Sequence, residues 1–118
     1  MIAFMEFGKP LEDSCDLESM SVGMSVQLPA RGLLRRVQRH DVSIVKQSDD
    51  VTTELLGYLT SGREIDEAAI EVYRDEDSAA PSLVYLLKKI QVTSIHSMGG
   101  HDHVGLNCAT VTTRLPQG

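Results

Sequence analysis

Hydrophobic and polar residues alternate one by one along several parts of the chain, and this period predicts β-strands. In residues 20–28 every second residue is apolar, and those between are small or polar. Such alternation is typical of a strand with one face toward a core. Strands are also expected over Ile2–Phe7 and around residues 42–45. The second is entered through residues 33–39, with a bulge because the alternation changes phase between Val37 and Val42.

One short helix is expected after residues 42–45. Ser48, Asp49 and Asp50 offer side-chain acceptors for the unpaired amides of a helix start. Apolar residues then recur at helical spacing on one face: Val51, Leu55, Tyr58 and Leu59. Gly62 fits the left-handed residue that ends a helix.

The remainder of the chain predicts three more strands, over residues 68–74, 83–95 and 104–115. Residues 75–81 are interpreted as a hairpin loop, and residues 97–103 and the acidic residues 11–16 as loops. About six strands with one helix and no strand–helix alternation favour a mainly β fold. We expect a single domain over residues 1–118, an antiparallel two-sheet β-barrel or sandwich with one short lateral α-helix.

Composition excludes several classes of protein. The chain is 42% hydrophobic and 24% charged, ordinary for a globular domain. It has two Phe, three Tyr and no Trp, which argues against sites built from stacked rings. The longest apolar run, residues 83–87, is too short to span a membrane. The first ten residues lack a basic segment before an apolar one, so we expect no secretory signal peptide.

Charge is unevenly distributed around a net value of −6. Residues 31–46 carry five cations against one acid, and residues 49–77 carry ten acids against two arginines. Three arginines of the first segment and three acids of the second are the candidate interface residues: Arg35, Arg36, Arg39, Glu64, Asp66 and Glu67. Both segments can be solvated surfaces, or one subunit's cationic face can meet its neighbour's anionic face.

Candidate chemistry is sparse. His101 and His103 would point the same way in an extended segment and suggest a metal ligand pair, but two ligands are not a site, and the sequence places neither His40 nor His96 near them. Four carboxylates surround Cys15 and disfavour its thiolate, and Cys108 alternates with apolar residues as a core residue does. Both are expected to be free thiols in a reducing compartment.

No motif of a hydrolase, phosphate-binding loop or zinc protease is present, which is only weak evidence against an enzyme, and no residue pattern indicates a cofactor. Arg35, Arg36 and Arg39 could follow a phosphate backbone, but no aromatic residue lies between Phe7 and Tyr58 to stack on bases. Nucleic-acid binding is therefore not expected.

The order of the segments resembles the Hcp family, the haemolysin-coregulated tube proteins of bacterial type VI secretion. Residues 17–24 resemble the family's early strand, and residues 41–49 its strand that ends in Lys and an acidic turn before the single helix. Residues 60–65 resemble the exit of that helix. The later strands of the family are matched by residues 69–74, 84–94 and 99–108. The chain departs from the family in its short connections, residues 8–16 and 29–36, and in having few aromatic residues.

The resemblance implies a non-enzymatic tube protein that forms homo-hexameric rings, stacks into the expelled tube and carries effectors. It implies spike and sheath proteins as further partners, and export from the bacterial cytoplasm without a signal peptide. A monomeric or dimeric β-barrel binding module is the alternative. A metal-assisted enzyme using His101, Asp102 and His103 is a third possibility with an incomplete ligand set.

Overall fold

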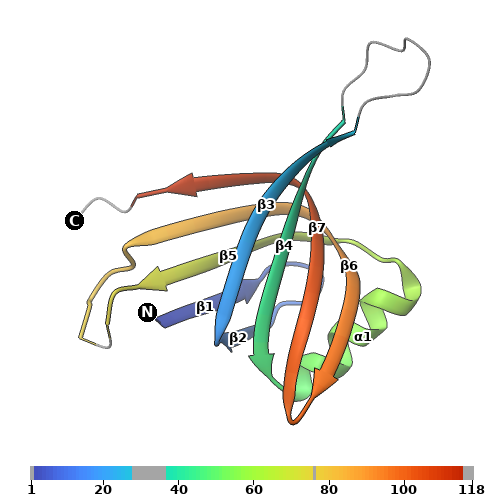
Figure 1. Cartoon of the computed structure of the whole chain (residues 1–118), viewed down its shortest axis with the longest axis horizontal. Coiled ribbons are helices and arrows are strands. Elements are labelled where there is room, and N and C mark those ends of the chain that lie inside the picture. The colour runs from blue at the N-terminus through green and yellow to red at the C-terminus, as the bar shows by residue number, and fades with distance from the viewer. Residues whose placement is uncertain (1, 28–36, 76, 116–118) are drawn as a thin grey trace.

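The protein is mainly β, as predicted. The computed structural model describes residues 2–27, 37–75 and 77–115. Its strands form a seven-stranded sheet in the order β2-β1-β5-β6-β7-β4-β3, and every neighbouring pair is antiparallel (Figure 1). The elements are β1 (Ile2–Phe7), β2 (Ser14–Leu17), β3 (Ser19–Gln27), β4 (Val37–Gln47), α1 (Asp50–Ser61), β5 (Ile65–Tyr73), β6 (Leu83–Met98) and β7 (His101–Arg114).

The two strands at the ends of this order are consecutive in the chain. β2 pairs with β1 and β3 pairs with β4, yet only Glu18 separates β2 from β3. The Glu18 backbone amide donates to the carbonyl of Val45 at 2.7 Å, so the ladder with β4 continues across the junction. The sheet must therefore curl until its ends meet, which gives the predicted barrel-like form (Figure 1).

The core lies inside the curl, and strict alternation directs side chains into it. In β1, Met5 and Phe7 are buried while Phe4 and Glu6 are exposed. From Asp102 onward β7 buries every second residue as far as Cys108. Helix α1 covers the core with Val51 and Leu55. Full burial of one such apolar side chain contributes about 1.5–3 kcal/mol.

Local signals set both ends of α1 as predicted. Asp49 is the N-cap, and its carboxylate accepts a hydrogen bond from the backbone amide of Val51 at 3.0 Å. Gly62 ends the helix with a φ of 71°, and its amide donates to the carbonyl of Tyr58. The positive φ is the left-handed conformation that glycine adopts without steric cost.

Two predicted loops are wrong. Residues 14–16 belong to β2, where Cys15 and Leu17 point inward; this strand is too short and acidic for its alternation to be recognised. The predicted loop 97–103 is a hairpin whose turn is only Gly99 and Gly100, with φ values of 60° and 83°. Two positive φ values in a two-residue connection match the twist of the flanking strands.

The predicted bulge between Val37 and Val42 is also wrong. The register of β4 against β3 is unbroken from Val37 to Val45. β4 pairs with β7 only from His40 onward. The alternation of apolar and polar residues before His40 is therefore not determined by packing in the barrel. An irregularity occurs in β6 instead, between Val92 and Ser94. The predicted hairpin loop between β5 and β6 is confirmed, since these strands pair as neighbours.

Membrane crossing by a helix finds no support in the structure. Within the described ranges no helix combines the length and the apolarity that a bilayer requires.

Candidate functional site

An acidic cleft lies where β1 turns toward β2. It has a volume of about 880 Å³, and Lys9 is the one cation among its lining residues. The lining carboxylates are Glu6, Glu12, Asp13, Asp66 and Glu67. The sequence-predicted Asp66 and Glu67 thus share this cleft, while Glu64 is exposed just before β5. Such a concentration of negative charge attracts cationic partners.

Backbone contacts between the turn after β1 and β5 bring these distant acids together. The amide of Gly8 donates to the carbonyl of Glu67, and the amide of Asp66 donates to the carbonyl of Lys9, both at 2.8 Å. A Cβ at Gly8 would lie 2.7 Å from Cγ of Glu67. Glycine at this position therefore allows the turn to close against β5.

The three candidate arginines are not brought to this cleft by the described part of the chain. Arg35 and Arg36 lie outside the described residues, and Arg39 belongs to β4, where only its backbone register against Ser25 is defined. The pairing of these arginines with Glu64, Asp66 and Glu67 of a neighbour stays a prediction.

Of the strand edges that remain unpaired among the described residues, two belong to β7 and β3. β6 pairs with β7 as far as Arg114, but β4 pairs with β7 only up to Cys108. Residues 109–114 therefore have no strand partner on the β4 side. β3, last in the sheet order, forms the second edge. Unpaired edges are templates for strand addition by another chain.

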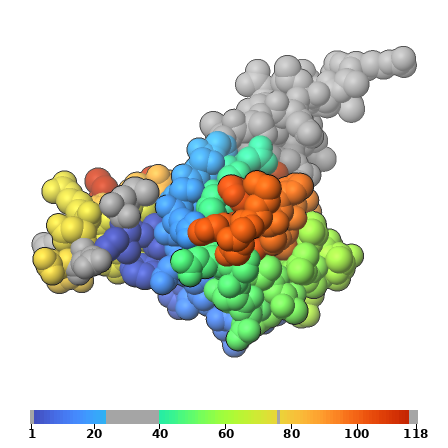
Figure 2. Space-filling view, turned by 60° about the horizontal axis from the view of Figure 1, so that its bottom comes forward, coloured from blue at the N-terminus to red at the C-terminus, as the bar shows by residue number. Residues whose placement is uncertain are grey.

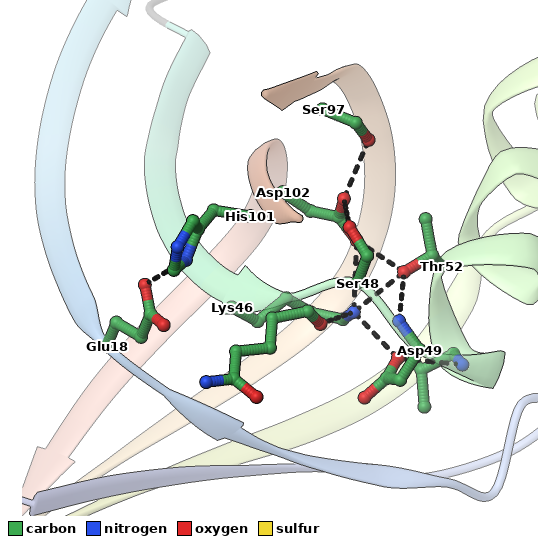
Figure 3. A network of polar contacts seen from close by, with 10 residues as sticks. Glu18, Lys46, Ser48, Asp49, Thr52, Ser97, His101 and Asp102 are labelled. Carbon is green, nitrogen blue, oxygen red and sulfur yellow. Dashed lines mark hydrogen bonds and ion pairs between the residues drawn. The ribbon is translucent and has the colours of Figure 1, made fainter. Parts of the chain in front are cut away.

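A buried polar network joins β4, the start of α1 and the β6–β7 hairpin (Figure 3). Its centre is the ion pair between Lys46 and Asp102, both fully buried, with Nζ 3.2 Å from Oδ2. The Asp102 carboxylate also accepts hydrogen bonds from the hydroxyls of Ser48 and Ser97, each at 2.6 Å, and from the hydroxyl of Thr52. This carboxylate therefore links three elements that are distant in sequence.

The ammonium group of Lys46 is equally well satisfied. Nζ donates to the Gln47 carbonyl and to Oδ1 of Asp49 at 2.8 Å, and to the Thr52 hydroxyl at 2.9 Å. The amide of Ser48 donates to the Gly100 carbonyl, which holds the hairpin turn against the segment before α1. Figure 2 shows that end of the molecule, with the orange hairpin beside the green helix.

Both charges are favoured at neutral pH. Burial alone would raise the pKa of Asp102, but the hydrogen bonds that its carboxylate accepts outweigh burial and hold the pKa well below its usual range. Burial would likewise lower the pKa of Lys46, whereas hydrogen bonds to Asp49 and Asp102 raise it above its ordinary value. The network is thus a fixed ion pair. Neither Lys46 nor Asp102 is expected to change its charge near neutral pH.

The network was not predicted from the sequence, although the sequence contains a signal for it. Lys46 continues the alternation of the buried Val42 and Ile44, and Asp102 continues that of the buried Val104 and Leu106. A charged residue at a strand position that points into the core needs an ion-pair or hydrogen-bond partner. Lys46 and Asp102 are also direct partners across the β4–β7 ladder, which only the tertiary pairing reveals.

The histidines are arranged differently from the metal hypothesis. His101 and His103 share the exposed face of β7, but Asp102 points to the buried face and cannot join them. The β6–β7 pairing places His96 directly opposite His103, a neighbourhood that sequence order does not show. Nδ1 of His101 lies 2.8 Å from Oε2 of Glu18. Over the described residues, no group of three or more His, Cys, Asp or Glu is arranged to hold a metal ion.

Both cysteines are free thiols buried in the barrel. Burial is the main cause that raises the pKa of Cys15 to about 12, with smaller contributions from nearby acids, and burial raises the pKa of Cys108 to about 11. Cys108 is a core residue as predicted, while Cys15 lies in β2 and not in a loop.

We expect neither thiol to react with iodoacetamide in the folded protein near pH 8, because both thiolates are scarce and covered. Mass spectrometry of the alkylated protein checks this, with a urea-unfolded sample as the control that must take up two labels. Rapid labelling of either native thiol would contradict the buried placement.

Comparison with known proteins relates the chain to one family. Residues 8–114 match the family described as type VI secretion system effector, Hcp. A search of curated protein sequences gives no match. Among solved structures, the chain is similar to Hcp1 from Salmonella typhimurium, with a TM-score of 0.72 and 16% identity, covering 97% of this chain and 85% of that one.

Two further structures share the fold. The secreted protein Hcp3 from Pseudomonas aeruginosa has a TM-score of 0.64 and 16% identity, over 98% of this chain and 99% of that one. The tube-terminating cap of the anti-feeding prophage has a TM-score of 0.65 and 10% identity, over 97% and 88%. These likenesses show the fold, and the family match over residues 8–114 shows more: the chain belongs to the Hcp family and is a tube protein of the type VI secretion system.

Proposed function

We propose that the chain assembles into homo-hexameric rings that stack into the inner tube of the secretion apparatus and carry effectors. The observation that carries the proposal is the presence of two different unpaired edges, β3 and residues 109–114 of β7, on one subunit. Two different edges on one subunit suit a head-to-tail contact, and such a contact covers both of these edges in every subunit when it closes into a ring.

An apolar strip beside the β7 edge supports the same contact. On the outer face of the sheet, the half-buried Ala69 of β5 lies opposite the half-buried Leu86 of β6. Leu115, at the end of β7, is 73% exposed and borders the same groove. Apolar surface next to an open strand edge is typical of a subunit contact.

Charge supports the orientation of neighbours. We place Arg35, Arg36 and Arg39 of one subunit against Glu64, Asp66 and Glu67 of the next. The acidic cleft holds two of these acids on an exposed surface, and residues 31–40 contain four arginines and no acid. Complementary faces of this kind steer association and select the partner.

The proposal extends to the cell. The chain would be non-enzymatic, would be exported from the bacterial cytoplasm without a signal peptide, and would contact spike and sheath proteins as well as effectors. It requires no cofactor, nucleic acid or membrane insertion. The buried network of Lys46 and Asp102 supports the non-enzymatic part of this proposal, because its charges are enclosed and hold secondary-structure elements together.

Light scattering coupled to size exclusion tests the assembly. We expect a species with six times the mass of the 12.9 kDa chain. A strict monomer or dimer at tens of micromolar would overturn the ring and favour a β-barrel binding module.

A charge-swap experiment tests the proposed contact. The variant R35E/R36E/R39E has two acidic faces, and E64K/D66K/E67K has two basic faces, so each alone should lose assembly through like-charge repulsion. An equimolar mixture should restore the six-subunit mass, because the two variants can alternate around a ring. If the wild type forms the ring and either variant alone also assembles normally, the charge pairing is rejected, while the proposal of a ring still stands.

A further inference from the structure

A second cavity, separate from the acidic cleft, opens beside the start of β1. Its volume is about 540 Å³, and it combines two aromatic rings, Phe4 and Tyr73, with three carboxylates, Asp16, Glu18 and Asp75. No lysine, arginine or histidine is among its lining residues. A lining that combines aromatic rings with carboxylates and contains no cationic side chain is suited to bind a cationic ligand.

The sheet register builds the aromatic part. Phe4 of β1 lies directly opposite Asp16 of β2 on one side and Glu71 of β5 on the other. The Phe4 and Tyr73 rings meet edge to face, with centroids 5.7 Å apart and planes at 77°. Phe4 is nevertheless 40% exposed, so part of its ring remains free for another group. The Tyr73 hydroxyl donates to Oε2 of Glu71 at 2.7 Å and is already satisfied.

The carboxylates of this cavity differ in the hydrogen bonds and ion pairs that they already make. Glu18 pairs with His101, and Oδ1 of Asp75 accepts hydrogen bonds from the Asp77 amide and the Ser78 hydroxyl. Asp16 is exposed and makes no hydrogen bond or ion pair with another described residue. It is therefore the carboxylate most available to a ligand, and it stands directly across from Phe4.

We propose that this cavity binds the guanidinium group of an arginine side chain. A planar guanidinium stacks on an aromatic face and pairs with a carboxylate through two parallel N–H donors, and the row of Phe4 and Asp16 presents both acceptor types side by side. Lysine offers only a point charge to the same row. The inference goes beyond ring formation and does not depend on it.

Two sources can supply this chemistry. One is an arginine of another protein, such as carried cargo, and the other is the arginine-rich segment 31–39 of another copy of the chain. Both present the same guanidinium group, and the experiment below separates them.

The test is a titration with N-acetylarginine methylamide, followed by NMR of the methyl groups of Ile2, which lines the cavity on the same face of β1 as Phe4 and remains observable in a large ring. We expect saturable shifts of these methyl groups. The neutral isostere N-acetylcitrulline methylamide should bind about tenfold more weakly, since it lacks the charge needed for both interactions. Equal binding of the two compounds would overturn the proposal.

Variants locate the binding. D16N should weaken it about fivefold and F4L about threefold, at unchanged melting temperature because both positions are exposed. D13N is the matched control, since Asp13 lies in the acidic cleft, which has no aromatic pair near its carboxylates. An equal loss in D13N and D16N would mean general attraction to negative charge and would also overturn the proposal.

Comparison of the wild type with R35Q/R36Q/R39Q identifies the source. Binding to both forms indicates an open cavity for an arginine of another protein. Binding only to the triple variant indicates that the assembled wild type covers the cavity, either with segment 31–39 of another copy or through the subunit contact that these arginines hold. Absence of binding to both forms rejects the arginine site, whatever the state of assembly.

Discussion

Replacing Asp102 with alanine should destabilise the folded chain by about 3–5 kcal/mol, the usual cost of leaving a buried charge without its partner. Lys46 would keep Asp49 as a counter-ion, but the Asp49 side chain is 46% exposed and balances the buried ammonium group less well. The hydroxyls of Ser48 and Ser97 would also lose their acceptor. Urea unfolding of both proteins at equal concentration gives the difference in free energy.

The control for this prediction is D41A. Asp41 is also in a strand of the barrel, but it is exposed, and among the described residues it accepts one side-chain hydrogen bond, from Asn107. Its loss should cost less than about 1 kcal/mol. The double variant K46M/D102A should be more stable than the sum of its single variants predicts, because the two residues interact directly. Similar costs for D102A and D41A would contradict the role assigned to the network.

The second large effect is a dependence on acid. The hydrogen bonds of Asp102 hold its folded-state pKa below the value of about 3.9 in an unfolded chain. The group therefore stabilises the fold fully above that unfolded value, and the contribution is lost as the pH falls toward the folded-state pKa. Lys46 has a raised pKa and stays charged throughout this range; its contribution is lost only when the pH rises through that raised value.

The comparison of wild type with D102N isolates this effect from that of the other acids. The difference in free energy of unfolding should be constant from pH 7 to pH 5 and should shrink between pH 5 and pH 3, since asparagine does not titrate. Urea unfolding at each pH and at one protein concentration measures it, because assembly makes apparent stability depend on concentration. A difference that stays constant down to pH 3 would mean that Asp102 is not a buried, strongly hydrogen-bonded carboxylate.

Features that depend only on neighbouring residues could be predicted from the sequence. The alternation of residues 20–28 identifies β3, and Asp49 and Gly62 set the ends of α1 through contacts within a few residues. These signals depend on local conformation and on the burial of one face. All residues that contribute to each of these signals lie within a short stretch of the chain.

Features that depend on which strands meet could not be predicted in this way. The closure of the sheet through Glu18, the position of His96 opposite His103, and the Lys46–Asp102 pair all follow from pairings between distant segments. The same holds for the cavity of Phe4 and Tyr73, which needs β1 between β2 and β5. Hydrophobic period alone does not specify strand order.

We infer that this barrel completes its strand pairing by joining copies of itself in a closed ring. Negative-stain images of the purified protein at tens of micromolar test it most directly. We expect class averages with six-fold symmetry and an open centre. A field of single small particles without rotational symmetry would contradict it.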